Sequence, residues 1–167
     1  MESGALRRQA ELYNPLDLIE QIVNAHEWLY ERASDDKMTV TAAGSWCDYH
    51  LHFGWNDQPA ALQIVCAFDC RVPEPRIAEV HGLLALINAQ IWLGHFDAIE
   101  DQGLLMFRYV LLAAEHGSIT ASQCESLLEV AIQECERFFP AFQFVMWGGK
   151  TSRDALAAAM IETVGEA

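Results

Sequence analysis

The chain has 167 residues, 52% hydrophobic and 20% charged, which suits a single folded domain with a full core rather than a disordered segment. Its 24 acidic and 10 basic residues give a net charge of -14, which phosphate backbones and anionic bilayers would repel. We therefore expect no nucleic-acid partner and no membrane partner. Polar residues interrupt every apolar run well before the roughly 18 residues that a membrane span requires.

The five cysteines predict reduced thiols and a cytoplasmic location, because their number is odd and the N-terminus has no apolar signal segment. Cys66 and Cys70 lie four residues apart on a predicted strand, so their Cα atoms would be about 13 Å apart. A disulfide needs a separation below about 7 Å. We expect all five cysteines to be small core residues.

The first elements are predicted from capping and periodicity. Residues 1–13 have no clear period and are interpreted as a flexible N-terminal arm, followed by one domain over residues 14–167. Asn14 and Pro15 are typical of a helix start. An apolar stripe through Leu18, Ile22 and Leu29 predicts that this helix continues to about residues 34–36.

Three strands are expected next, at residues 37–43, 46–55 and 60–69, because apolar and polar residues alternate along each of them. The third strand carries Leu62, Ile64 and Cys66 on one face and Val65 and Ala67 on the other. That composition predicts a central strand that is buried on both faces.

The second half of the chain predicts a helix from about Pro73 to Gly94 and two strands at residues 96–100 and 104–113. Capping boxes at Thr120 and Thr151 open two further helices, the first ending at the Gly148-Gly149 pair and the second near residue 164. The order is α-β-β-β-α-β-β-α-α. Short turns between strands favour antiparallel pairing, so we predict an α+β fold with about five strands.

A possible metal site lies on the second strand. Asp48, His50 and His52 alternate with apolar residues and would point to the same side, so both imidazoles could reach one zinc ion. The simpler interpretation is the solvent-facing side of a half-covered sheet, and we expect no metal and no cofactor. The sequence also lacks a Gly-x-Ser-x-Gly turn, and we predict no enzymatic activity.

The aromatic segment before the double glycine admits two interpretations. One face of this helix packs on the sheet, and the rest is either covered by the last helix or forms a dimer or client interface, where aromatic residues and Met are enriched. The residues proposed for that interface are Phe138, Phe142, Met146 and Trp147.

The chain resembles the YbjN family of bacterial proteins, which are labelled sensory transduction regulators. The resemblance is carried by Pro140-Ala-Phe-Gln-Phe-Val-Met-Trp-Gly-Gly-Lys, by Ala155-Leu, by Ile161-Glu-Thr-Val-Gly-Glu-Ala and by Pro73, Arg76, Asn88 and Gly94. It implies a fold similar to type III secretion chaperones and a protein-binding role that is non-enzymatic and often dimeric. It provides no catalytic residues, because none are established for the family.

We therefore expect a non-enzymatic cytoplasmic protein-interaction module, chaperone-like or regulatory, that acts as a homodimer and binds another protein. The alternative is a regulator that senses a small molecule or metal through the His50 and His52 face of the sheet. Fold resemblance alone does not decide between these two functions.

Overall fold

The computed structural model describes residues 14–114 and 118–165, with the side chains of Glu100 and of residues 162–165 excepted. The predicted N-terminal arm, residues 1–13, lies outside the described residues. The elements are α2 (Pro15–Ala25), β1 (Leu29–Ser34), β2 (Lys37–Ala43), β3 (Asp48–Asp57), β4 (Ala60–Arg71), α3 (Ile77–Asn88), β5 (His95–Ile99), β6 (Leu104–Leu112), α4 (Ala121–Met146) and α5 (Ser152–Gly165). This is the predicted α+β class.

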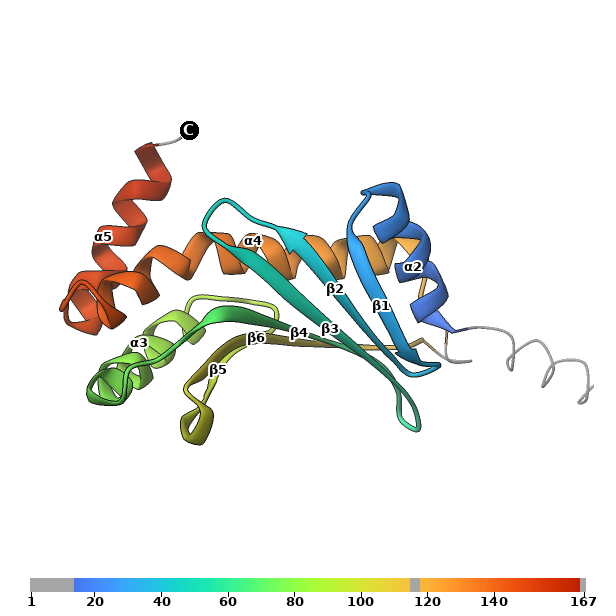
Figure 1. The fold of residues 1–167 in the computed structure, drawn as a ribbon, viewed down its shortest axis with the longest axis horizontal. Coiled ribbons are helices and arrows are strands. Elements are labelled where there is room, and N and C mark those ends of the chain that lie inside the picture. The colour runs from blue at the N-terminus through green and yellow to red at the C-terminus, as the bar shows by residue number, and fades with distance from the viewer. Residues whose placement is uncertain (1–13, 115–117, 166–167) are drawn as a thin grey trace, which may run out of the picture.

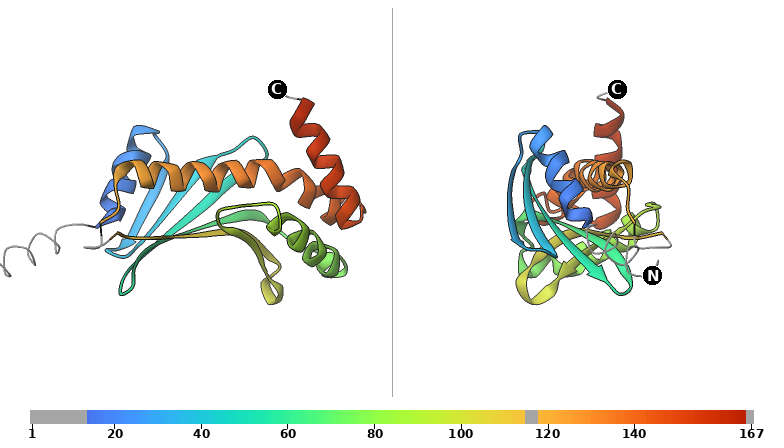
Figure 2. Two further views of the ribbon diagram at one scale, coloured as in Figure 1. Left: turned by 180° about the vertical axis from the view of Figure 1, so that it is seen from behind. Right: turned by 90° about the vertical axis from the view of Figure 1, so that its right-hand side faces the viewer.

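The six described strands form one antiparallel sheet in the order β1-β2-β3-β4-β6-β5. Figure 1 shows α4 running along one face of this sheet, with α2 at one end and α3 and α5 together at the other. Figure 2 shows that none of the described helices lies over the opposite face. The domain therefore has two layers, with its core between the sheet and the helices.

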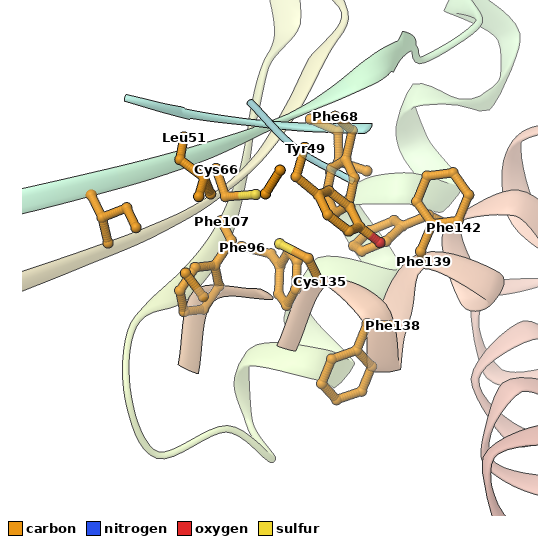
Figure 3. Close-up of a cluster of buried hydrophobic side chains, with 14 of the residues drawn as sticks. Tyr49, Leu51, Cys66, Phe68, Phe96, Phe107, Cys135, Phe138, Phe139 and Phe142 are labelled. Atoms are coloured by element: carbon orange, nitrogen blue, oxygen red, sulfur yellow. The ribbon is translucent and has the colours of Figure 1, made fainter. Parts of the chain in front are cut away.

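The core is built around a cluster of aromatic rings (Figure 3). Phe96 of β5 meets Phe142 of α4 with ring centroids 5.4 Å apart and Phe138 at 5.7 Å. On strand β4, Phe68 lies 5.4 Å from Phe139 of the same helix. Each aromatic pair adds about 0.5–1.5 kcal/mol to the free energy of burial, so this cluster fixes α4 on the sheet.

The predicted capping box at Thr120 and the glycine turn are confirmed, and Thr151 caps its helix through its hydroxyl. The hydroxyl of Thr120 accepts from the Gln123 amide at 3.2 Å, and the hydroxyl of Thr151 accepts from the Asp154 amide at 3.3 Å. Between these helices, Gly149 has φ of 66°, as expected for a helix that ends in the left-handed region. This turn directs the chain into α5.

The first helix prediction is wrong beyond Ala25, since residues 29–34 form β1 and give the sheet a sixth strand. Glu27 adopts φ of 58°, and the Trp28 amide donates to the Val23 carbonyl at 3.0 Å. This bond satisfies a carbonyl at the end of the helix in the Schellman arrangement, so α2 stops one turn before the apolar stripe does. The stripe suggested a longer helix because Trp28 and Leu29 also fit its spacing.

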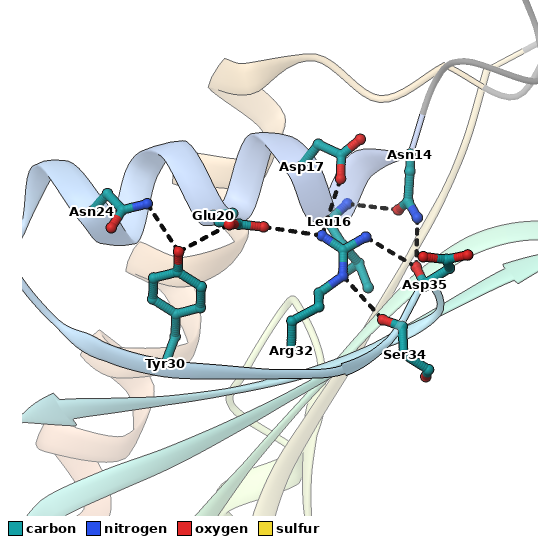
Figure 4. A network of polar contacts seen from close by, with 9 residues as sticks. All are labelled: Asn14, Leu16, Asp17, Glu20, Asn24, Tyr30, Arg32, Ser34 and Asp35. Carbon is teal, nitrogen blue, oxygen red and sulfur yellow. Dashed lines mark hydrogen bonds and ion pairs between the residues drawn. The ribbon is translucent and has the colours of Figure 1, made fainter.

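A polar network docks β1 against α2 (Figure 4). Arg32 bonds the carboxylates of Asp17 at 3.0 Å and Glu20 at 3.2 Å. The hydroxyl of Tyr30 donates to Glu20 at 2.9 Å and accepts from Asn24 at 3.2 Å. These contacts join residues that are distant in sequence, and they stabilise a strand that has little apolar alternation of its own.

The strands β2, β3 and β4 are confirmed within a few residues. β4 is central in the sheet, as predicted, but the expectation that both its faces are buried is wrong. Leu62, Ile64 and Cys66 are buried towards the helices, whereas Val65 and Ala67 are half-exposed. No described helix covers their face, so Val65 here reflects the preference of a pleated strand for β-branched residues rather than a second core.

Candidate interaction surfaces

Most of the aromatic residues proposed as an interface belong to the core of the chain. Phe138 and Phe142 are fully buried and Met146 is 4% exposed, so none of them offers a surface to a partner. Trp147 is 56% exposed at the C-terminal end of α4. Helical periodicity identified these residues as apolar but could not determine which of them the sheet and α5 would cover.

The metal-site candidates lie on the helix-free face of β3. His52 lies across from Thr39 of β2, whose hydroxyl is 3.2 Å from its Nδ1 atom, and His50 lies between Thr41 and Ala67 in the strand register. Burial, and secondarily the neighbouring His50, lowers the pKa of His52. Among the side chains that the structure describes, no group of three His, Cys, Asp or Glu residues could hold a metal ion.

The cysteines and the buried tyrosine are poorly suited to act as nucleophiles. Burial raises the pKa of the Cys47, Cys70 and Cys124 thiols to about 11, and it raises the pKa of Cys135 as well. Burial likewise raises the pKa of the fully buried Tyr49 above its ordinary value. Because the thiolate is the reactive form, these cysteines are protonated and inert at neutral pH.

Large apolar side chains are exposed near the end of β6. In the loop between α3 and β5, Trp92 is 97% exposed, and its neighbour Leu93 is 46% exposed. On β6 itself, Val110 and Leu112 are 47% and 67% exposed. Single exposed apolar residues are ordinary, but a group of them marks a contact surface.

A shallow groove of about 200 Å³ lies beside these residues, between β6, the α3–β5 loop and α4. It is lined by Leu93, Tyr109, Leu111, Ser122, Gln123, Ser126, Leu127 and Val130. None of these residues is ionisable at neutral pH, although the chain carries a net charge of -14. The groove is therefore an uncharged area on an acidic protein.

A second groove, of about 430 Å³, separates α2 from α4. Ile22, Trp28 and Leu128 contribute apolar surface, and Glu125 and Glu129 of α4 also line it. The ring of His26 stacks on the Trp28 indole with their centroids 4.8 Å apart. The volume is within the range of ligand pockets, and the two carboxylates would favour a cationic group beside an apolar one.

The sequence did not identify the group at the end of β6. Trp92 and Leu93 were assigned to the continuation of a helix stripe that ends at Asn88, and Val110 and Leu112 were two apolar residues of an ordinary strand. The helix was predicted to end at Gly94, but it ends at Asn88, and Gly94, with φ of 71°, lies in the turn directly before β5.

These observations describe an α+β domain in which helices cover one face of an antiparallel sheet and apolar side chains are exposed at one corner of it. The YbjN family, described as "Putative bacterial sensory transduction regulator", matches residues 15–144. The chain belongs to this family. The family description names a regulator and no reaction.

One solved structure with a similar fold is described as "Crystal structure of YbjN, a putative transcription regulator from E. coli". It is 12% identical to this chain, with a TM-score of 0.53, and the match covers 88% of this chain and 93% of that one. At this identity the likeness is one of fold. No curated protein matches the chain.

Among the described residues, none of the helices has the length and hydropathy that a membrane crossing requires. The predicted likeness to type III secretion chaperones stays a prediction.

Proposed function

We propose that this protein is a non-enzymatic regulatory module of the cytoplasm that forms a homodimer and binds a second protein. The observation that carries the proposal is the set of exposed apolar side chains around the end of β6: Val110 and Leu112 on the helix-free face, Leu93 at the uncharged groove on the helix side, and Trp92 next to it in the chain. Such a surface costs free energy in water and is typical of a protein–protein contact.

The described residues give little support to a catalytic function. Cys47, Cys70 and Cys124 have raised pKa values, which argues against a reactive thiolate. The His50 and His52 pair has threonine, alanine and valine rather than a further ligand in its strand register, which gives the metal-sensing alternative no additional support. The regulator description of the family favours a binding role.

The cytoplasmic part of the proposal is supported by the five cysteines, all of which are free thiols. Disulfides are common in oxidising compartments and rare in the cytoplasm.

Light scattering on the purified protein at micromolar concentration tests the homodimer. We expect twice the 18.7 kDa mass of one chain. A mass of 18.7 kDa throughout would refute this part of the proposal.

We place the second protein in the groove between α2 and α4, where an apolar side chain next to a Lys or Arg would meet Trp28 and the carboxylates of Glu125 and Glu129. The chain would be purified from its native cell as wild type, as the groove variant Trp28→Ser/Glu125→Gln and as a control, Ile99→Ser. Ile99 is exposed but belongs to the distant strand β5. A protein that is lost from the double variant and kept by the control would support this placement, whereas equal recovery would contradict it.

A further inference from the structure

The sheet edge at β5 is closed by side chains of the chain itself. Asn88 of α3 donates to the Phe96 carbonyl at 3.0 Å and accepts from the Phe96 amide at 2.8 Å. The carboxylate of Asp97 accepts from the Ala98 amide at 2.9 Å. The outward-facing backbone groups of Phe96 are therefore satisfied, and a further strand could not pair with them without displacing Asn88.

The opposite edge, β1, is protected by charge. Glu31 and Arg32 lie within this six-residue strand, and Arg32 also donates from Nε to the Ser34 carbonyl at 3.0 Å. Charged residues and a short strand are common means of preventing pairing at a sheet edge.

β6 extends beyond the strand that covers it. β5 pairs with β6 only as far as His95 and Arg108, because the chain turns away at Gly94. On its other side β6 continues to pair with β4 as far as Leu112, and the Ala113 amide donates to the Ala60 carbonyl at 2.9 Å. The last residues of β6 are thus paired on one side and uncovered by any described strand on the other.

The direction of the backbone groups follows from this bond. Since the Ala113 amide points towards β4, alternation along the strand directs the amides and carbonyls of Val110 and Leu112 away from β4. Their side chains lie on the helix-free face, where both are exposed. The side chains of Tyr109 and Leu111 lie on the helix side and line the small groove.

We propose that a second copy of this chain pairs with this open end of β6, strand to antiparallel strand, so that the two sheets become continuous. The inference rests on the proposed homodimer and specifies its interface. A two-fold axis at Leu111 places Val110 of one copy opposite Leu112 of the other, and each pair exchanges amide-to-carbonyl bonds. The two Leu111 side chains meet on the helix side, at the groove.

Charge opposes a second copy little at this position. Two chains that each carry -14 repel one another, and contact is least costly where no carboxylate faces the partner. The lining of the groove, from Leu93 to Val130, contains no ionisable side chain at neutral pH.

The apolar surface area at this edge is of the order that a specific dimer interface buries. Trp92 is 97% exposed next to Leu93 at the groove. A buried Trp removes about 150–250 Å² from water, so burial of Trp92 in both copies would supply about a third to a half of the roughly 1,000 Å² that a specific interface buries. Leu93, Val110 and Leu112 of each copy add to this area.

Two variants test the register and the edge. In Leu111→Cys, the two new thiols would lie at a non-hydrogen-bonded pair, where Cα atoms are about 4.5 Å apart, within the range of a disulfide. We expect a covalent dimer after mild oxidation. Wild type and Leu29→Cys, with a cysteine exposed on the far edge strand β1, serve as controls and should stay uncrosslinked.

Val110→Pro removes the amide that would bind the partner while leaving every bond between β6 and β4 in place. We expect a monomer with the far-ultraviolet spectrum and melting temperature of a folded protein. A Val110→Pro protein that stays dimeric would overturn the edge as the interface, and loss of the dimer without crosslinking at Leu111 would overturn the register.

The test separates this inference from the homodimer on which it rests. A wild-type dimer that neither variant affects leaves the homodimer standing and refutes the β6 interface. A wild-type monomer refutes both. In that monomer, slow hydrogen exchange at Val110 and Leu112 would mean that another segment of the same chain covers the edge, and rapid exchange would leave the edge open to a foreign strand.

Discussion

Gly149→Val should destabilise the fold through backbone conformation alone. The residue has φ of 66°, and a Cβ atom built there meets nothing within 4 Å. A left-handed conformation costs an L-residue about 1–2 kcal/mol, and a β-branched residue lies at the upper end of that range. For a domain of this size, a loss of about 2 kcal/mol lowers the melting temperature by about 4–8 °C.

The turn at Gly149 also joins α5 to the rest of the domain. Arg76 donates from Nη2 to the Lys150 carbonyl at 2.7 Å, and the Ser152 amide donates to the Glu79 carboxylate at 2.9 Å. If valine changes φ instead of accepting the strain, these bonds are lost and α5 moves away from the domain, which exposes its buried Leu156 side chain. In that case the variant should bind more of a hydrophobic dye.

Gly54→Val is the matched control. Gly54 lies in β3, its Cβ would also meet nothing within 4 Å, and its φ is not positive. Valine favours a strand, so the melting temperature should stay constant or rise. Equal melting temperatures for wild type and Gly149→Val, measured by calorimetry alongside this control, would refute the reasoning.

Three further predictions concern single side chains. Asn88→Ala should lower the free energy of unfolding by about 1–3 kcal/mol in urea titrations, because both Phe96 bonds are lost; no change would show that water replaces them. Glu27→Gly should raise it by up to about 1 kcal/mol in the same assay, because glycine tolerates φ of 58°, and a decrease would contradict this. The thiols of Cys47 and Cys70, with pKa values of about 11, should react slowly with Ellman's reagent at pH 8. A reaction as fast as that of a free, unburied thiol would refute their burial. Since folding raises both values, the stability they contribute should be lost as the pH rises from about 8.5 towards 11.

Local patterns predicted the elements whose causes are local. The alternation in β2 and β3 and the helix starts at Thr120 and Thr151 depend on neighbouring residues, and they were predicted correctly. β1 was missed because its stability comes from Arg32 and Tyr30 binding to α2 rather than from its own alternation.

Sequence periodicity could not predict the exposed surface at the end of β6 for a different reason. Phe138 and Phe142 are core residues because β4, β5 and β6 curve under α4. No local sequence pattern predicts this arrangement of the strands. The exposure of Val110 arises because no described helix covers its face of the sheet and because β5 ends before it. Such properties depend on which strands are neighbours and on where each one stops.

The most direct test of the central claim is sedimentation equilibrium of the wild-type protein over a dilution series at low and high salt. We expect twice the 18.7 kDa chain mass, with tighter association at high salt, because salt screens the repulsion between two chains of charge -14. A mass of 18.7 kDa at every concentration and salt would contradict the account.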